Sequence, residues 1–124
     1  MGKTVHNDVL DAALDKVATG NQMSACATEP TTRTEAITTN KLAIVAMTPG
    51  DGNDYTVSDG DTNGRKVEVG AQTGVTVDST GTADHVALVD ASILLYVTTC
   101  TSQGLTAANT VDFPAWDIEI ADPT

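Results

Sequence analysis

The sequence predicts a mainly β fold, an antiparallel and jelly-roll-like β-sandwich with one N-terminal α-helix. Three observations predict it. Residues 83–120 form short β-branched and apolar runs separated by Ser, Gly and Asn, which is typical of consecutive antiparallel strands. Residues 5–17 carry an apolar stripe at helical spacing. Hydrophobic residues make up 40% of the chain and aromatic residues only 3%, so we expect a core of Val, Ile, Leu and Ala.

Length and charge limit the possible functions. With 124 residues the chain is expected to form a single domain, residues 1–124, with a helix at about 8–19 and strands between about 23 and 120. Its formal net charge of −11 argues against nucleic-acid partners and against binding to an anionic membrane surface. No apolar run approaches the roughly 20 residues of a membrane span, and no secretion signal is visible. We therefore expect a protein that is made in the cytoplasm.

The helix is predicted from about Asp8 to Thr19. Asn7 or Asp8 can cap its start, and Gly20 can take the left-handed position after its end. The apolar stripe consists of Val5, Val9, Leu10, Ala13, Leu14 and Val17. Such a stripe must be buried on the sheet of the same chain or on another subunit.

The middle of the chain predicts short strands between polar loops. Thr28–Thr39 and Asp51–Gly64 have loop composition, and in the second loop only Tyr55–Val57 could pair. The expected strands in this part are Met23–Cys26, Lys41–Met47, Arg65–Val69 and Gly74–Val77, which gives about eight strands in the whole chain.

Two runs near the C-terminal end, Asp84–Asp90 and Ile93–Thr99, are mostly apolar on both faces. This pattern indicates strands inside a sandwich or under a partner. Cys100–Gly104 is interpreted as a break between two strands.

The last strand is predicted to have one solvent-exposed face, because Trp116, Ile118 and Ile120 alternate with Asp117 and Glu119. Val111 and Phe113 have the opposite parity to Trp116, which predicts a register shift near Pro114.

The acidic segment Asp59–Gly64 matches the first half of a calcium-binding loop. Its second half fails, because the twelfth position is Gly70 where a bidentate Glu is needed, and Glu68 comes two residues early. Asp, Asn and Gly are also turn residues, so we interpret the segment as a solvated turn and expect no metal site.

No catalytic constellation is predicted. His85 follows Asp84, but neighbouring strand residues point to opposite faces, so we do not expect a catalytic dyad. No Ser or Cys lies in a nucleophile elbow, and there is no phosphate loop or dinucleotide fingerprint. The sequence therefore predicts no enzyme activity and no cofactor.

The two cysteines and the single tryptophan leave alternatives open. Cys26 and Cys100 could be bridged, or both could be free buried thiols, which a reducing compartment favours. Trp116 could lie in the core, the favoured interpretation, or anchor an interface. The candidate partner-interface residues are Val9, Leu14 and Trp116.

Four segments carry a resemblance to a known family. They are the helix with Val9–Leu14, the stretch Met23–Ala36, the stretch Gly81–Asp90 with Leu94–Tyr96, and Leu105–Ala115. In their order they resemble small structural proteins of tailed bacteriophages, of the tail-fibre-like and capsid-decoration kind. This resemblance implies a β-sandwich and a place in the virion, and it implies no catalytic residues.

Three function classes follow. We rank a capsid decoration or cement protein first. A single small domain without repeats or a coiled coil fits a decoration module better than a receptor-binding fibre. An acidic outer surface would also keep particles apart. A tail or tail-fibre-associated component is the alternative, and a small enzyme or binding module is the third. The expected partners are the major capsid protein or a tail protein, and further copies of the chain in a homo-oligomer.

Overall fold

The computed structural model describes residues 2–123 and shows a mainly β chain with one N-terminal α-helix. Within these residues the elements are α1 (Asn7–Val17), β1 (Gln22–Cys26), the π-helix η1 (Glu35–Thr39), β2 (Lys41–Ala46), β3 (Tyr55–Asp59), β4 (Arg65–Val69), β5 (Gln72–Thr76), β6 (Gly81–Val89), β7 (Leu94–Leu105), β8 (Thr110–Phe113) and β9 (Trp116–Ile120). The predicted fold class is confirmed.

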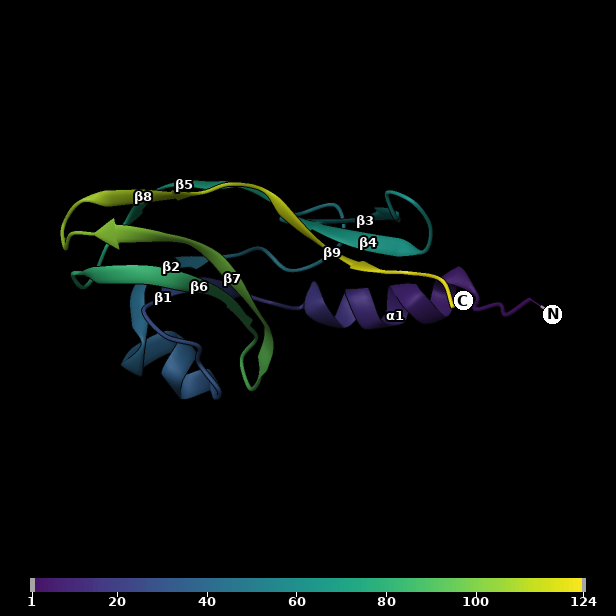
Figure 1. Cartoon of the computed structure of the whole chain (residues 1–124), viewed down its shortest axis with the longest axis horizontal. Coiled ribbons are helices and arrows are strands. Elements are labelled where there is room, and N and C mark those ends of the chain that lie inside the picture. Colours follow the sequence, from purple (N-terminus) through teal and green to yellow (C-terminus); the bar gives the residue numbers. More distant parts are fainter. Residues whose placement is uncertain (1, 124) are drawn as a thin grey trace.

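All strand pairs are antiparallel and fall into three sheets. The largest has the order β2-β1-β6-β7, and the two smaller ones have the orders β3-β4-β9 and β5-β8. β5 and β8 lie above the four-stranded sheet, and the β3-β4-β9 sheet lies above α1 (Figure 1). The jelly-roll arrangement is not confirmed, because a jelly roll has eight strands in two sheets.

One hydrophobic core runs through the space between the sheets and α1. Its largest fully buried members are Tyr55, Leu14, Met23, Leu88, Val67 and Val69. A second, smaller cluster lies on the other face of the four-stranded sheet, where Ala36 of η1 packs against Ala87 and Val89. Because η1 covers that face, β6 is buried on both sides, and this explains why its sequence is apolar on both faces.

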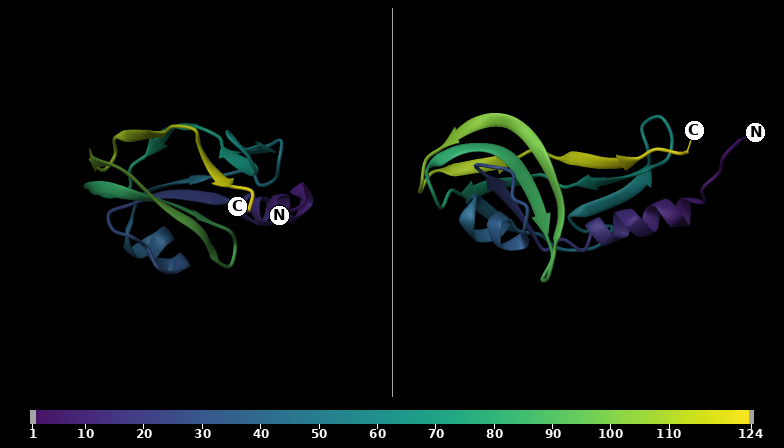
Figure 2. Two further views of the ribbon diagram at one scale, coloured as in Figure 1. Left: turned by 45° about the vertical axis from the view of Figure 1, so that its right-hand side comes forward. Right: turned by 60° about the horizontal axis from the view of Figure 1, so that its bottom comes forward.

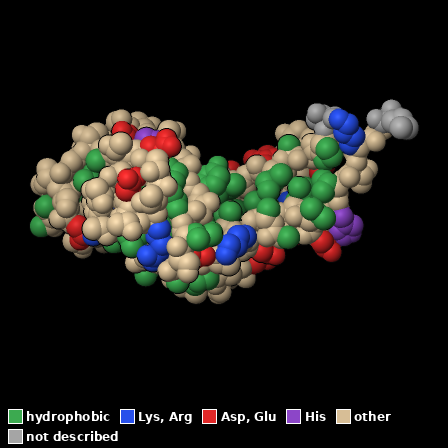
Figure 3. Space-filling model, turned by 90° about the horizontal axis from the view of Figure 1, so that it is seen from below, with side chains coloured by type: hydrophobic (Ala, Val, Ile, Leu, Met, Phe, Trp, Pro, Cys, Tyr) green, Lys and Arg blue, Asp and Glu red, His purple; other side chains and the backbone are tan. Residues whose placement is uncertain are grey.

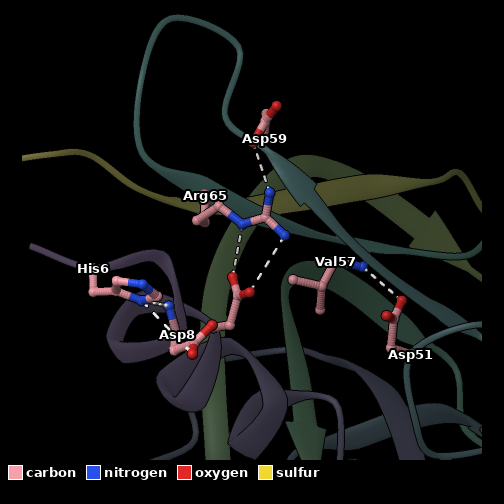
Figure 4. A network of polar contacts seen from close by, with 7 residues as sticks. His6, Asp8, Asp51, Val57, Asp59 and Arg65 are labelled. Carbon is pink, nitrogen blue, oxygen red and sulfur yellow. Dashed lines mark hydrogen bonds and ion pairs between the residues drawn. The ribbon is translucent and has the colours of Figure 1, made fainter.

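The helix belongs to the core of its own chain. It begins one residue before the predicted start and ends two residues before the predicted end, and His6 Nδ1 accepts a hydrogen bond from the Asp8 amide at 3.0 Å. Arg65 joins it to the β3–β4 hairpin: Nε donates to Asp11 Oδ1 at 2.7 Å and Nη1 donates to Asp59 Oδ1 at 2.6 Å (Figure 4). Leu14 is 0% exposed under these strands, so its prediction as a partner-interface residue is wrong.

Two predicted irregular segments contain regular elements. Cys100–Gly104 lies within β7, with Gly104 opposite Thr82 and Gln103 opposite Ala83, although the register with β6 shifts at Cys100–Ser102. The predicted loop Thr28–Thr39 contains η1. In both places polar residues keep regular backbone hydrogen bonds, which composition alone does not reveal.

The predicted register shift near Pro114 is confirmed. β8 pairs with β5, whereas β9 pairs with β4, so the chain passes from one sheet to another at this proline. On β9, Ile118 is buried and Asp117 and Glu119 are exposed, as the alternation predicted. The first helix, α1 in purple, and the last strand, β9 in yellow, lie at the same end of the molecule (Figure 2).

Candidate functional site

The described surface has a groove between β7 and the β8–β9 segment. It consists of a cavity of about 430 Å³ and an adjoining one of about 240 Å³. Both are lined by Val86, Cys100, Phe113 and Pro114. The larger one also contacts Thr98, Thr99, Trp116 and Asp117, and the smaller one Ala25, Ala83, Thr101, Gln103, Leu105, Val111 and Asp112. We call this surface the β7–β9 groove.

Aromatic side chains gather at the groove. The chain contains one Trp, two Tyr and one Phe. Phe113 and Trp116 line the groove, and the ring of Tyr96 lies 6.0 Å from that of Trp116 between centroids, at an interplanar angle of 34°. Three of the four aromatic residues are therefore at this one place. Tyr96 is 37% exposed and Trp116 is half-buried, as expected of residues that can contact a partner.

Unpaired strand edges border the groove. β7, β8 and β9 are each the last strand of their sheet. β7 and β8 follow one another in the chain, yet they do not pair. The twelve residues of β7 include no Asp, Glu, Lys, Arg or Pro. Natural edge strands usually carry a charge or a proline that prevents pairing with another chain, and β7 carries neither.

The rim of the groove is acidic. Asp112 and Asp117 are among its lining residues, and no Lys or Arg is. Asp112 Oδ1 accepts a hydrogen bond from the Gly74 amide at 2.9 Å, and Asp117 Oδ2 lies 3.7 Å from Lys66 Nζ. The groove thus combines an apolar floor, an uncharged edge strand and a negative rim.

The structure places Asp84 and His85 in contact, contrary to the prediction. His85 Nδ1 lies 2.7 Å from Asp84 Oδ1. The register between β6 and β7 shifts between Ala83 and His85, so Asp84 lies opposite a bulge of β7, where strict alternation of faces fails. Across the sheet His85 is in register with Cys26 and Thr99. The hydrogen bonds within residues 2–123 give His85 no hydroxyl or thiol partner that it could activate.

The two cysteines are free. Cys26 is buried, with Sγ 3.5 Å from Ser24 Oγ, and burial raises the pKa of its thiol, which makes it unreactive. Cys100 is exposed in the groove, so the expectation of two buried thiols is correct for Cys26 and wrong for Cys100. Partial burial, and then the charge of Asp84, raise the pKa of the Cys100 thiol.

The three predicted partner-interface residues are not brought together. Leu14 is in the core, and Trp116 lies in the groove. Val9 is 61% exposed on α1, and Figure 3 shows hydrophobic side chains at the surface of that end of the molecule. Sequence reasoning missed Tyr96, Phe113 and Cys100. The signal that could have found this edge is the run Leu94–Leu105, which has no charged residue in a strongly acidic chain.

The segment Asp59–Gly64 forms the turn of the β3–β4 hairpin. The Gly60 amide donates to the Gly64 carbonyl at 2.9 Å, and Asp61 Oδ1 lies 2.7 Å from Lys66 Nζ. In the described part of the chain no three His, Cys, Asp or Glu side chains are grouped as metal ligands would be. Among the same residues no helix has the length and hydrophobicity needed to cross a membrane.

We compared the chain with protein-family models, with curated proteins and with solved structures, and none of them matches it.

Proposed function

We propose that this chain is a structural protein of a tailed bacteriophage that decorates the capsid and cements the shell by docking through the β7–β9 groove. The observation that carries the proposal is the gathering of three of the four aromatic residues between unpaired strand edges. Buried aromatic anchors supply much of the binding energy in protein interfaces. The resemblance of the sequence to small virion proteins supplies the biological setting.

The arrangement of groups supports binding rather than catalysis. The groove has an apolar floor, and its one thiol, Cys100, has a raised pKa, which disfavours the nucleophilic thiolate. The Asp84–His85 pair has no nucleophile within hydrogen-bonding distance among the described residues. A catalytic triad requires a nucleophile and a base in contact, and this pair provides only the base and its orienting carboxylate.

Charge supports a position on the outside of a particle. A net charge of −11 keeps particles coated with this protein apart and soluble. The groove, by contrast, has an uncharged edge strand at which a partner can approach without burying unpaired charges. We expect the major capsid protein to be that partner.

The first experiment measures where the protein is and in how many copies. In purified virions, decoration predicts a copy number close to that of the major shell protein. A few copies per particle would support the tail or tail-fibre-associated alternative, and absence from virions would contradict both.

The second experiment tests the docking surface. Purified protein is added to particles from which it has been stripped, and bound protein and heat resistance are measured. Tyr96→Ala should weaken particle binding at least about tenfold, because it removes an exposed aromatic contact of Trp116. Val9→Ala is the matched control, since Val9 is an exposed hydrophobic residue outside the groove. If Val9→Ala abolishes binding and Tyr96→Ala does not, the docking surface is α1 and not the groove.

A further inference from the structure

We propose that the β7–β9 groove binds its partner as an added β-strand: an extended segment that pairs with the free edge of β7, places alternate apolar side chains in the groove and carries Lys or Arg at its ends. The inference rests on the proposed function in that this segment belongs to the shell protein. It adds the chemistry and the conformation of the segment that is recognised.

The backbone of β7 provides the first argument. In an antiparallel strand, residues point their amide and carbonyl groups alternately to one neighbour and to the other. Among residues 2–123, β7 has β6 on one side and no strand on the other, so its outer edge carries backbone groups that face away from the sheet. The alternation is interrupted at Cys100–Ser102, where β7 has three residues opposite the single Asp84 of β6. An extended peptide can satisfy them by strand addition, a common mode of peptide recognition. Residues 99–104 of β7 are all exposed, which leaves room for a strand of about six residues or 20 Å.

The floor of the groove provides the second argument. An added strand points every second side chain to one face. One face of a strand beside β7 would lie over Phe113, Pro114 and Trp116, and the other would face solvent. The segment should therefore alternate apolar and polar residues. The main-chain pairing would supply affinity, and the fit of the apolar side chains would supply specificity.

Charge provides the third argument and selects the occupant. Asp112 and Asp117 lie at the rim. No Lys or Arg lines the groove. A segment with a cation at each end is attracted by these carboxylates. A second copy of the chain would instead bring its own acidic rim to the same place, and it has six Lys and Arg residues against seventeen Asp and Glu. We therefore choose a basic segment of another protein as the occupant.

The native thiol of Cys100 makes a sensitive test possible, because it lines the groove and the other thiol is buried. The probe is a capped nine-residue peptide of alternating Val and Thr with a Lys at each end and a central Cys that is supplied as its mixed disulfide with β-mercaptoethanol. It is equilibrated with the full chain at pH 8 in a fixed concentration of β-mercaptoethanol. The Cys100 thiolate attacks the peptide sulfur and releases β-mercaptoethanol, and the disulfide-linked fraction is read by intact mass. Cys100→Ser must abolish capture, which locates the linkage.

Three matched peptides separate strand addition from adventitious disulfide exchange. A peptide with Glu in place of both Lys residues tests charge. Two further peptides, N-methylated at odd or at even positions, test pairing, because only amides that point to β7 are needed. We expect the Lys-ended peptide to be captured at a concentration at least about tenfold lower than the Glu-ended one. One parity of N-methylation should cost a similar factor and the other should have little effect. Equal capture of all four peptides overturns the proposal.

Two variants complete the test. Asp112→Asn combined with Asp117→Asn should reduce the preference for Lys ends over Glu ends to within about threefold, and an unchanged preference contradicts the charge argument. Sedimentation of the protein alone tests the second copy as occupant. If the chain is a dimer that Thr101→Glu dissociates and Thr101→Gln does not, a second copy occupies the edge and the proposal is wrong.

The outcomes distinguish this inference from the proposed function. A protein that is absent from virions but captures the Lys-ended peptide loses its proposed function and keeps its mode of recognition. A protein that binds stripped particles through Tyr96 but captures all four peptides equally keeps the function and loses the added strand.

Discussion

Tyr55 offers a stability test whose sign and size follow from the structure. Its side chain is 0% exposed and is the largest that is fully buried, and its hydroxyl donates to the Gly20 carbonyl at 2.9 Å. Burial, and then the charge of Asp54, raise the pKa of Tyr55 from 10.0 to about 12. The folded state therefore keeps a proton that the unfolded state releases between pH 10 and 12.

This difference makes the protein less stable as pH rises. Above pH 10 the unfolded state binds fewer protons than the folded state, so the free energy of unfolding falls with pH. Because the pKa of Tyr55 is raised by about two units, the free energy of unfolding should fall by about 2–3 kcal/mol once pH 12 is reached. Well below pH 10 this titration does not change it.

Tyr55→Phe removes both the hydrogen bond and the titration. Near pH 7 the variant should be less stable by about 1 kcal/mol, because the Gly20 carbonyl loses its donor. Above pH 10 the wild type loses stability that the variant keeps, so the two curves should approach and cross near about pH 11. Urea unfolding at a series of pH values from 7 to 12 measures this difference, and other titrating groups cancel in it. A difference that stays constant over the whole range would refute the assignment.

Three further predictions concern the core, the acidic turn and the thiols. In urea titrations, Leu14→Ala should lower the free energy of unfolding by about 2–4 kcal/mol, because Leu14 is fully buried. The exposed control Val9→Ala should lower it by less than about 0.5 kcal/mol. Similar losses in the two variants would contradict the burial of Leu14. The melting temperature should be the same in calcium and in chelator, because the turn Asp59–Gly64 lacks the closing ligand; a rise of many degrees would reveal a site. A thiol reagent should titrate Cys100 in the native protein and Cys26 only after unfolding, and two rapidly reacting thiols would show that Cys26 is accessible.

The fold class was predictable because local patterns carry it. The stripe of α1 and the alternation along β9 are one-dimensional signals with periods near 3.6 and 2, and both are present in the structure. The shift at Pro114 was predictable for the same reason, since two neighbouring runs had opposite parity. Parity does not say which strand each run pairs with.

The groove was not predictable from such patterns. Its aromatic residues Tyr96, Phe113 and Trp116 come from three different strands, and only the order of strands in the sheets brings them together. The contact between Asp84 and His85 depends on a bulge, because β7 has three residues, Cys100–Ser102, opposite the single Asp84 of β6, and the sequence does not identify this partner strand. The division of the helical stripe between buried Leu14 and exposed Val9 likewise depends on how much of α1 the strands cover.

Two local irregularities explain why the sandwich is open at this place. Two strands that are joined by a short turn usually pair as a hairpin. β7 and β8 are joined by the turn 106–109 and do not pair with each other. The bulge of β7 opposite Asp84 adds twist to the β6–β7 pair, and both strands curve strongly in Figure 2. Pro114 donates no backbone hydrogen bond at the point where β8 gives way to β9. Together they hold the edge of β7 apart from β8 and β9, so the free edge and the groove beside it have one structural cause. A change that restored pairing between β7 and β8 would therefore remove the proposed strand-binding edge and the aromatic groove at the same time.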